Sequence, residues 1–218
     1  MDAETLKSIA RQLRQPHGEQ GIQVAKKMNE GNLHINRFTI EALELTRDDN
    51  ILEIGMGNGF FVKDILSADV SVRYTGCDFS PTMVKEAHLL NKVFVQAQQA
   101  EFLLADAGRL PFKSETFDKV FTVNTIYFWD DPGKTLSEIA RVLKPEGWIV
   151  IAVRPERVMS NYPFAQFGFQ LFTTDDLKTL LKENNFFLKD IIERKEPDQE
   201  VNGMKIPVET LIAIGSKL

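Results

Sequence analysis

Apolar residues in the first 46 positions recur at helical spacing. Leu6, Ile9 and Leu13 fall on one face of a helix, and residues 15–18 (Gln-Pro-His-Gly) interrupt that pattern. Two more short helical patterns follow, around residues 22–28 and 36–45, with no strand pattern among them. We therefore expect the chain to begin with an N-terminal helical segment, residues 1–46.

From position 50 onward, short apolar runs alternate with helical stripes. Residues 148–153 (Trp-Ile-Val-Ile-Ala-Val) are apolar throughout, as in a strand that a parallel sheet buries on both faces. This alternation predicts an α/β fold: a doubly wound, mostly parallel sheet with helices on both faces. Two final strands separated by a polar loop near residues 197–203 predict an antiparallel strand at the end. The expected strands are residues 51–54, 72–77, 102–105, 119–123, 148–153, 186–193 and 208–215.

Three helix starts are marked by local capping signals. Ser80 precedes Pro81, and these residues suit the N-cap and the first helical position. The acidic pair at residues 130–131 precedes a proline and opens the next helix, so we do not interpret it as a metal site. Thr173 and Asp176 have the spacing of a capping box.

Composition narrows the class of protein. A chain of 218 residues can form one well-buried domain with a small cover. The net charge of −5 disfavours a nucleic acid as partner. The single cysteine, Cys77, excludes an internal disulfide, and its place inside a strand favours buried packing over nucleophilic chemistry. We find neither a signal peptide nor a transmembrane segment, and we expect a cytoplasmic protein.

The first expected strand ends in a glycine-rich turn, Gly55-Met56-Gly57-Asn58-Gly59, directly before a helix. Ligands of open parallel sheets bind beyond the carboxyl ends of the strands, and glycines let them approach the backbone. A structural corner without a ligand is the plain alternative. The carboxylates Glu53 and Asp78 at neighbouring strand ends favour a ligand site instead.

Dinucleotide-binding enzymes use a similar turn, but their last two glycines stand three residues apart. Here Gly57 and Gly59 stand two apart. Glu53, two residues before Gly55, suits a cationic ligand and would repel a pyrophosphate. Asp78 ends the second strand, where a carboxylate can accept both hydroxyls of a ribose, and it fits either cofactor. The glycine spacing and Glu53 therefore disfavour a nicotinamide dehydrogenase.

More polar positions follow the next two strands. Asp106 and Ala107 come after the third strand, suitably placed for an adenine amino group, although Asp106 could also be a helix cap or a solvated loop acid. Residues 124–126 (Asn-Thr-Ile) follow the fourth strand, on the rim where the reacting end of a ligand would lie.

These motifs resemble the class I S-adenosylmethionine-dependent methyltransferases, in the type 11 group that includes ubiquinone and menaquinone methyltransferases. The resemblance covers about residues 50–153. Two positions depart from it: Met56 replaces a small residue or cysteine, and Glu146 stands where glycine is usual. The matching segments are residues 51–59, 76–83, 105–107, 110–112, 117–120 and 138–147.

The resemblance implies S-adenosyl-L-methionine as cofactor and S-adenosyl-L-homocysteine as product. It also implies the strand order 3-2-1-4-5-7-6, with strand 7 antiparallel, in a Rossmann-like domain over residues 47–218 that the N-terminal helical segment covers. The implied cofactor-binding residues are Glu53, Gly55, Met56, Gly57, Gly59, Asp78, Phe79, Ser80, Met83, Asp106, Ala107, Asn124, Thr125 and Ile126.

The acceptor side is less determined by the sequence. Residues 127–129 (Tyr-Phe-Trp) either line an acceptor pocket, with Tyr127 and Trp129 as candidates, or pack beneath the N-terminal helices. The aromatic stretch 162–172 divides between core and lid in the same way. His17 and His34 are candidate bases, and His34 is also a candidate residue of the acceptor pocket, although a lone histidine is more often structural.

We interpret the chain as a methyltransferase for a small-molecule acceptor, acting by direct in-line transfer as a monomer or homodimer. The sulfonium already activates the methyl group, so proximity and orientation can supply much of the barrier reduction. No convincing general base and no metal ligand set are apparent. The alternative is a non-catalytic protein that binds S-adenosylmethionine or a partner on the same fold.

Overall fold

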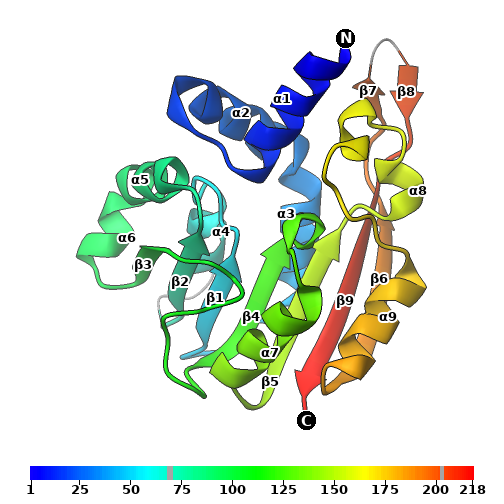
Figure 1. The fold of residues 1–218 in the computed structure, drawn as a ribbon. Helices are drawn as coiled ribbons and strands as arrows, with labels where there is room; N and C mark the ends of the chain where they lie inside the picture. Colours follow the sequence, from blue (N-terminus) through cyan, green and yellow to red (C-terminus); the bar gives the residue numbers. More distant parts are fainter. Residues whose placement is uncertain (68–70, 202–203) are drawn as a thin grey trace.

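The computed structural model describes residues 1–67, 71–201 and 204–218. Its centre is a seven-stranded sheet in the order β3-β2-β1-β4-β5-β9-β6, as Figure 1 shows. All neighbours pair in parallel except β9, which is antiparallel to both β5 and β6. The predicted order is therefore confirmed, with β9 as the predicted strand 7. The strands are β1 (Asn50–Ile54), β2 (Arg73–Asp78), β3 (Ala100–Leu104), β4 (Phe117–Val123), β5 (Leu143–Val153), β6 (Phe186–Lys195) and β9 (Glu209–Lys217).

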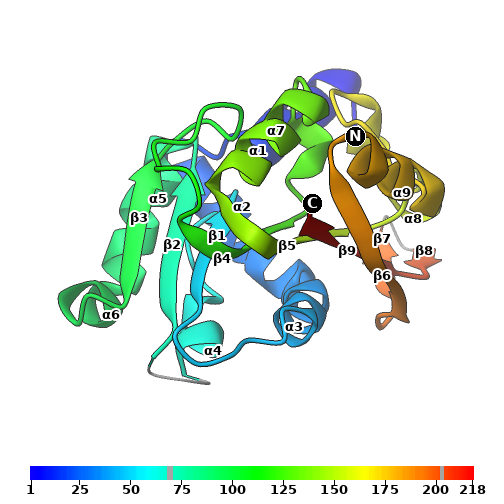
Figure 2. The ribbon, with the colours of Figure 1, turned by 90° about the horizontal axis from the view of Figure 1, so that it is seen from below.

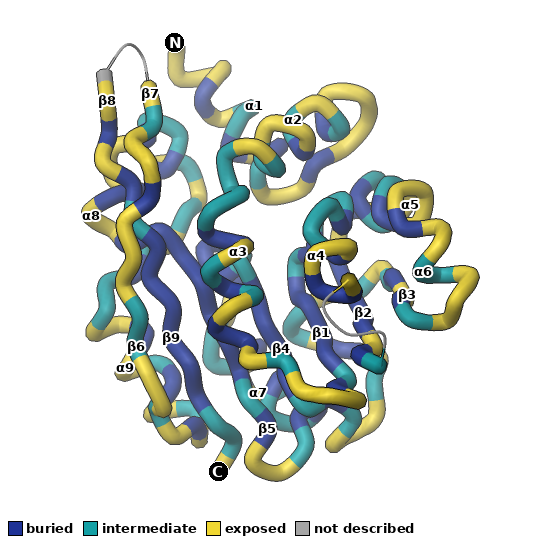
Figure 3. The backbone as a smooth tube through the Cα atoms, turned by 180° about the vertical axis from the view of Figure 1, so that it is seen from behind, coloured by how far each residue is buried: buried dark blue, intermediate teal, exposed yellow. Residues whose placement is uncertain are grey.

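Helices cover both faces of the sheet, as the alternating pattern predicted (Figure 2). Buried side chains of α3, α4 and α5 form one apolar cluster with one face, and those of α7 and α9 form a second cluster with the other. The central strands are buried almost throughout, whereas β6 at one edge is partly or fully exposed at every position after its first residue (Figure 3). The helices concerned are α3 (Leu33–Ala42), α4 (Val62–Leu66), α5 (Pro81–Leu90), α7 (Pro132–Val142) and α9 (Thr174–Glu183).

Two further N-terminal helices, α1 (Ala3–Arg14) and α2 (Gly18–Gly31), lie beyond the carboxyl ends of the parallel strands (Figure 1). The Ser80 hydroxyl at the start of α5 donates a hydrogen bond to the Pro16 carbonyl, between α1 and α2. In contrast, α3 packs on the sheet against β5 and β9. The first 42 residues thus divide into two helices above the strand ends and one helix within the layered core.

The predicted capping signals are confirmed. The Ser80 side chain accepts a hydrogen bond from the Met83 amide, with Pro81 as the first residue of α5. Asp131 caps α7 in the same way, through the Lys134 amide. Thr173 and Asp176 form the reciprocal capping box of α9. Each cap satisfies N–H groups that the helix itself leaves without a partner.

The structure adds elements that the pattern did not predict. A short helix α6 (Lys92–Gln96) follows α5. Strand β5 begins at residue 143, five residues earlier than predicted, and its first part is irregular. Its pairing with β4 shifts register there, and Glu146 has a positive φ of 60°. Where a plain polar loop was expected near residues 197–203, β7 (Gln199–Val201) pairs with β8 (Met204–Ile206), while residues 202–203 lie outside the described part. Between β5 and α9 lie α8 (Glu156–Met159) and the 3₁₀ turn η2 (Pro163–Gln166).

Cys77 in β2 is 1% exposed, as expected for a packing residue, and burial raises the pKa of its thiol. Among the described residues, no helix is both long and apolar enough to span a bilayer.

Candidate active site

The glycine turn after β1 has a backbone that only glycine adopts readily. Gly55 has a φ of 75° and Gly57 a φ of 58°, both in the left-handed region. A Cβ on Gly55 would lie 2.2 Å from the Thr125 Oγ1 atom, so the turn and the end of β4 touch without room for a side chain. No atom lies within 4 Å of the corresponding point on Gly57, which therefore faces open space.

Glu53 lies beneath this turn and is only 6% exposed. The Tyr74 hydroxyl donates a hydrogen bond to its carboxylate. Burial raises the pKa of Glu53 to about 7, with a further increase from Asp78, although the Tyr74 bond opposes both. Glu53, Gly55, Met56 and Gly57 line a small chamber of about 50 Å³, the glutamate chamber. A nearby cation would stabilise the ionised form of this carboxylate.

Asp78, at the end of β2, connects the turn to α5. Its two carboxylate oxygens accept hydrogen bonds from the amides of Gly57 at 3.0 Å and Ser80 at 2.8 Å. Burial raises the pKa of Asp78 to about 6, and these amide bonds counteract part of that rise. Asp78 is thereby held rigidly at the wall that two larger cavities share.

The first of these cavities, the aspartate chamber of about 240 Å³, contains Asp106 and Ala107 in its wall. The Asp106 carboxylate accepts a hydrogen bond from the Gly108 amide at 2.7 Å, a local turn bond. Trp129 lines the same chamber, and its buried Nε1 atom has no hydrogen-bond partner. A buried N–H without a partner is costly, so this atom is an unsatisfied donor beside the chamber.

The second, the central cavity of about 400 Å³, lies between the strand ends and helices α1 and α2. Side chains of α1 and α2, among them Ile9, Leu13 and Met28, form one apolar wall. The opposite wall is a group of aromatic rings in mutual contact, with centroid distances from 4.6 to 6.2 Å. These rings belong to Tyr127, Phe128, Tyr162, Phe164 and Phe169. This aromatic wall contains residues from two segments, 127–129 and 162–172. From the sequence, these segments could belong to the core, to an acceptor pocket or to a lid.

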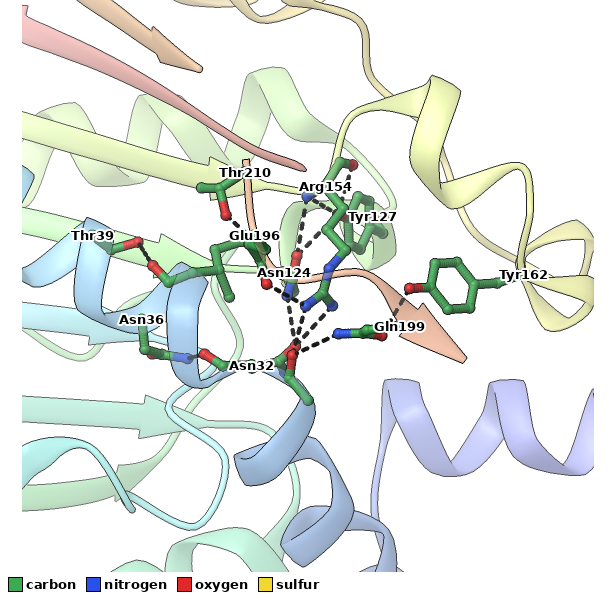
Figure 4. Close-up of polar contacts among 12 residues, drawn as sticks. Asn32, Asn36, Thr39, Asn124, Tyr127, Arg154, Tyr162, Glu196, Gln199 and Thr210 are labelled. Carbon is green, nitrogen blue, oxygen red and sulfur yellow. Dashed lines mark hydrogen bonds and ion pairs between the residues drawn. The ribbon is translucent and has the colours of Figure 1, made fainter. Parts of the chain in front are cut away.

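Several residues that line the central cavity belong to one polar network, which Figure 4 shows. The Arg154 guanidinium donates to the Asn32 side chain at 3.0 Å and pairs with Glu196 at 3.3 Å. Both ion-pair partners are buried, and the Arg154 Nε atom has no hydrogen-bond partner. Tyr162 donates to Gln199, which in turn donates to the Gly31 carbonyl. The network therefore fastens the end of α2 to β5 and to the β7–β8 hairpin.

Asn124 and Tyr127 extend this network toward the glycine turn (Figure 4). Asn124 adopts a φ of 54° and donates to the Asn32 side chain at 3.2 Å. The Tyr127 hydroxyl donates to the Asn124 side-chain oxygen at 2.9 Å and accepts from the Arg154 backbone amide at 2.7 Å. Asn124 and Thr125 line the central cavity together with Gly55.

Several sequence-predicted residues lie apart from these cavities. Ile126 is fully buried in the core, and Gly59 packs against Asn91 and Ala87. His34 lies against Phe38, with ring centroids 6.3 Å apart. The predicted site residues that line none of the three cavities are Gly59, Ser80, Met83, Ile126, His17 and His34. Trp129 lines the aspartate chamber and not the central cavity that contains Tyr127.

Besides Arg14 on α1, four polar residues of the central cavity were missed in the sequence: Lys27, Asn32, Arg154 and Gln199. Arg154 carried a usable signal, because it directly follows the most apolar strand, at the edge where parallel sheets bind ligands. The other three come from helix and hairpin positions whose polar character is ordinary for an exposed surface.

A sheet of this order, with a glycine turn after β1 and a carboxylate at the end of β2, defines the class I S-adenosylmethionine-dependent methyltransferases. A family model described as a methyltransferase domain matches residues 52–151. The O-methyltransferase rstn1 of Aspergillus nomiae is 30% identical over 179 residues, which cover 78% of this chain and 76% of that protein. The chain belongs to the S-adenosylmethionine-dependent methyltransferases.

Two other similarities agree with this assignment. The uncharacterized methyltransferase YdaC of Bacillus subtilis is 32% identical over 124 residues, or 57% of this chain and 66% of that protein. A methyltransferase solved in complex with the Haloferax volcanii activator Trm112 superposes with a TM-score of 0.77 at 20% identity, covering 88% of this chain and 92% of that one. The latter similarity concerns the fold alone.

Proposed function

We propose that this chain transfers the methyl group of S-adenosylmethionine to a small-molecule acceptor by direct in-line displacement. The observation that carries the proposal is the arrangement of the three cavities. Gly55 lines all of them, so the glutamate chamber, the aspartate chamber and the central cavity meet at the glycine turn. A donor extended across the first two would present its methyl group to the third.

The wall residues suit the parts of this cofactor. Glu53 would face the cationic methionine part, and Asp78 the ribose hydroxyls. Phe79, 37% exposed on the wall of the aspartate chamber, would lie against the adenine, with Asp106 and Ala107 at its edge. Asn124 and Thr125 would lie near the sulfonium. We assign Ser80, Met83 and Ile126 the role of positioning these residues, since they line no chamber.

The cofactor itself would supply an activated methyl group. This chain's residues would hold the reacting atoms in line and exclude water, which can account for much of the rate enhancement. We also propose that α1 and α2 are the part of the N-terminal segment that covers the site, because Ile9, Leu13 and Val24 line the central cavity. The name of the relative rstn1 supports an oxygen acceptor.

Calorimetric titration with S-adenosylmethionine and S-adenosylhomocysteine tests the cofactor assignment. We expect both to bind, and Asp78→Asn to weaken binding at least tenfold, because the amide loses a charged acceptor for the ribose. Asp64→Asn, an exposed change on α4, is the matched control and should leave affinity unchanged.

The outcomes of this titration separate the alternatives. The proposal fails if neither compound binds, or if Asp78→Asn and Asp64→Asn bind equally well. Binding without release of S-adenosylhomocysteine across a broad panel of small-molecule acceptors would favour a non-catalytic binding protein instead.

A further inference from the structure

The central cavity is built for a mainly apolar occupant. One wall consists of aliphatic side chains from α1 and α2, and the other is the aromatic group from Tyr127 to Phe169. An apolar cavity of 150 Å³ holds one benzene ring, so about 400 Å³ corresponds to two or three rings. Flat aromatic molecules would gain both apolar burial and ring contacts there.

The charges that face this cavity are mostly positive. In the described part of the chain, the charged side chains in its wall are Arg14, Lys27, Arg154 and Asp78. Arg14 pairs with exposed Asp130 at 2.9 Å. Asp78 is occupied by two backbone amides, as described above. The other two charged side chains in the wall, Lys27 and Arg154, are both positive.

Lys27 and Arg154 differ in how their charges are compensated. Lys27 is exposed on α2 and makes no ion pair or hydrogen bond with any described residue. Arg154 is 8% exposed, its charge is balanced by Glu196, and its Nε atom, which has no hydrogen-bond partner, is buried. The cavity wall thus contains one uncompensated cation, Lys27, and one paired cation, Arg154.

The same walls hold no group suited to remove a proton. Apart from Asp78, no carboxylate and no histidine among the described residues lines the central cavity. Besides the three cations named above, the titratable groups there are the hydroxyls of Tyr127 and Tyr162, and burial raises the pKa of both. Both therefore stay protonated near neutral pH, and each is already committed to a hydrogen bond within the polar network.

We propose that the acceptor is an aromatic compound of two or three rings whose acceptor oxygen, a phenolate or carboxylate, is already ionised when it is methylated. Lys27 and Arg154 favour the anion over its neutral form, in place of a protein base. This inference rests on the proposed methyltransferase function and names its substrate class.

The reaction balances without a proton transfer. The ionised oxygen donates an electron pair to the methyl carbon, and a carbon–oxygen bond forms as the carbon–sulfur bond breaks. The electron pair of the broken bond stays on sulfur, which becomes the neutral thioether. The acceptor changes from an anion to a neutral ether or ester, so the positive charges no longer attract it.

The binding part of the inference is testable without the cofactor. 4-Nitro-1-naphthol has two rings and a coloured ionised form, so absorbance titration reports its pKa in the bound state. We expect the ionised form to bind about tenfold more tightly than the neutral form, which lowers the bound pKa by about one unit. Added salt should weaken this preference, because Lys27 is exposed to solvent.

Variants separate Lys27 from general surface charge. Lys27→Gln should reduce the preference for the ionised probe about threefold, whereas Lys26→Gln, the adjacent exposed lysine that does not line the cavity, should leave it unchanged. Equal binding of both forms of the probe by the wild-type protein would overturn the inference.

Turnover provides the second measurement. For 1-naphthol, 4-chloro-1-naphthol and 4-nitro-1-naphthol, we expect the inflection of kcat/KM with pH to follow the pKa of each acceptor. An inflection at one pH for all three would indicate a protein base and overturn the inference, as would faster methylation of the neutral 1-naphthylamine.

Failure to bind any naphthol by a protein that binds S-adenosylmethionine would also overturn the inference and leave the methyltransferase proposal intact. Failure to bind S-adenosylmethionine would instead remove the proposed function.

Discussion

The Tyr74 hydroxyl donates a hydrogen bond to the Glu53 carboxylate beneath the glycine turn, and both side chains are buried. No ion pair joins this buried carboxylate to a cation in the described part of the chain. Burial consequently raises the pKa of Glu53 from its ordinary 4.5 to about 7.

This pKa makes the stability of the ligand-free protein depend on pH. The folded state retains a proton on Glu53 that the unfolded state releases above pH 4.5, so stability falls as the pH rises from about 4.5 to 7. The loss from Glu53 amounts to about 3 kcal/mol above pH 7. Asp78, with its pKa raised to about 6, adds a loss of the same sign.

Urea denaturation at pH 5 and pH 8 measures this effect. Glu53→Gln should show a smaller difference between the two pH values than the wild-type protein does. Glu101→Gln, at an exposed position of β3, is the control and should behave as the wild type. An undiminished pH dependence in Glu53→Gln would contradict the assignment.

Gly55→Ala should be much more damaging than Gly57→Ala. Both residues have a positive φ, which costs alanine about 1–2 kcal/mol. Only Gly55 adds a collision, since its Cβ would lie 2.2 Å from the Thr125 Oγ1 atom. Gly31→Ala is the control, because Gly31 lies in α2 with open space around it and no positive φ. In chemical denaturation, Gly55→Ala should lose the most stability, Gly57→Ala less and Gly31→Ala the least. Equal losses of stability in Gly55→Ala and Gly57→Ala would contradict the predicted collision.

Trp129→Phe should weaken S-adenosylmethionine binding severalfold, because it removes part of the ring that lines the aspartate chamber, where the nucleoside would lie. Trp148→Phe, on β5, is the control and should bind normally. The chain has two tryptophans, so the emission of Trp148→Phe reports on Trp129 alone and should change when S-adenosylhomocysteine is added. Unchanged affinity and unchanged emission would show that Trp129 has no contact with the cofactor.

Glu196→Gln should destabilise the fold by about 3–5 kcal/mol, because it leaves the buried Arg154 charge without compensation. Glu41→Gln removes the carboxylate from the exposed pair with Arg194 and should cost less than about 1 kcal/mol. If the two variants lost the same unfolding free energy within error, the Arg154 network would contribute no more to stability than a surface ion pair does.

Ser80→Ala should loosen the N-terminal segment as well as α5. It removes a helix cap, which costs about 1 kcal/mol, and the hydrogen bond to the Pro16 carbonyl. Thr173→Ala removes an equivalent cap from α9 without touching that segment. Limited proteolysis near residues 15–18 should therefore accelerate in Ser80→Ala only, and equal cleavage of both variants would disprove the link.

The sequence predicted the sheet because periodicity is local and strand order follows from the family resemblance. Caps such as Ser80 and Asp131 were predictable for the same reason, since each acts within three residues. The network around Arg154 was not predictable in this way. It joins side chains more than 100 positions apart, and no local sequence pattern predicts the hydrogen bond between Asn32 and Arg154.

Residues 127–129 show a second limit. The sequence could not choose between pocket and packing for Tyr127, and the structure gives it both: it is 2% exposed yet lines the central cavity. Trp129, two positions later, faces the other chamber, because the chain bends in the 3₁₀ turn η1 (Ile126–Phe128). Which way an aromatic ring faces after a strand depends on such a turn, and residue types alone do not specify it.

The burial of Cys77 has a practical consequence for following movement of the N-terminal helices. Its thiol is inaccessible and stays protonated, whereas thiol-reactive dyes require an accessible thiolate. A cysteine introduced at the exposed position of Lys26 on α2 would therefore be the one site to take up a maleimide fluorophore, with the native sequence otherwise intact. The dye's anisotropy would then report, in real time, whether α2 becomes ordered or released as ligands enter and leave.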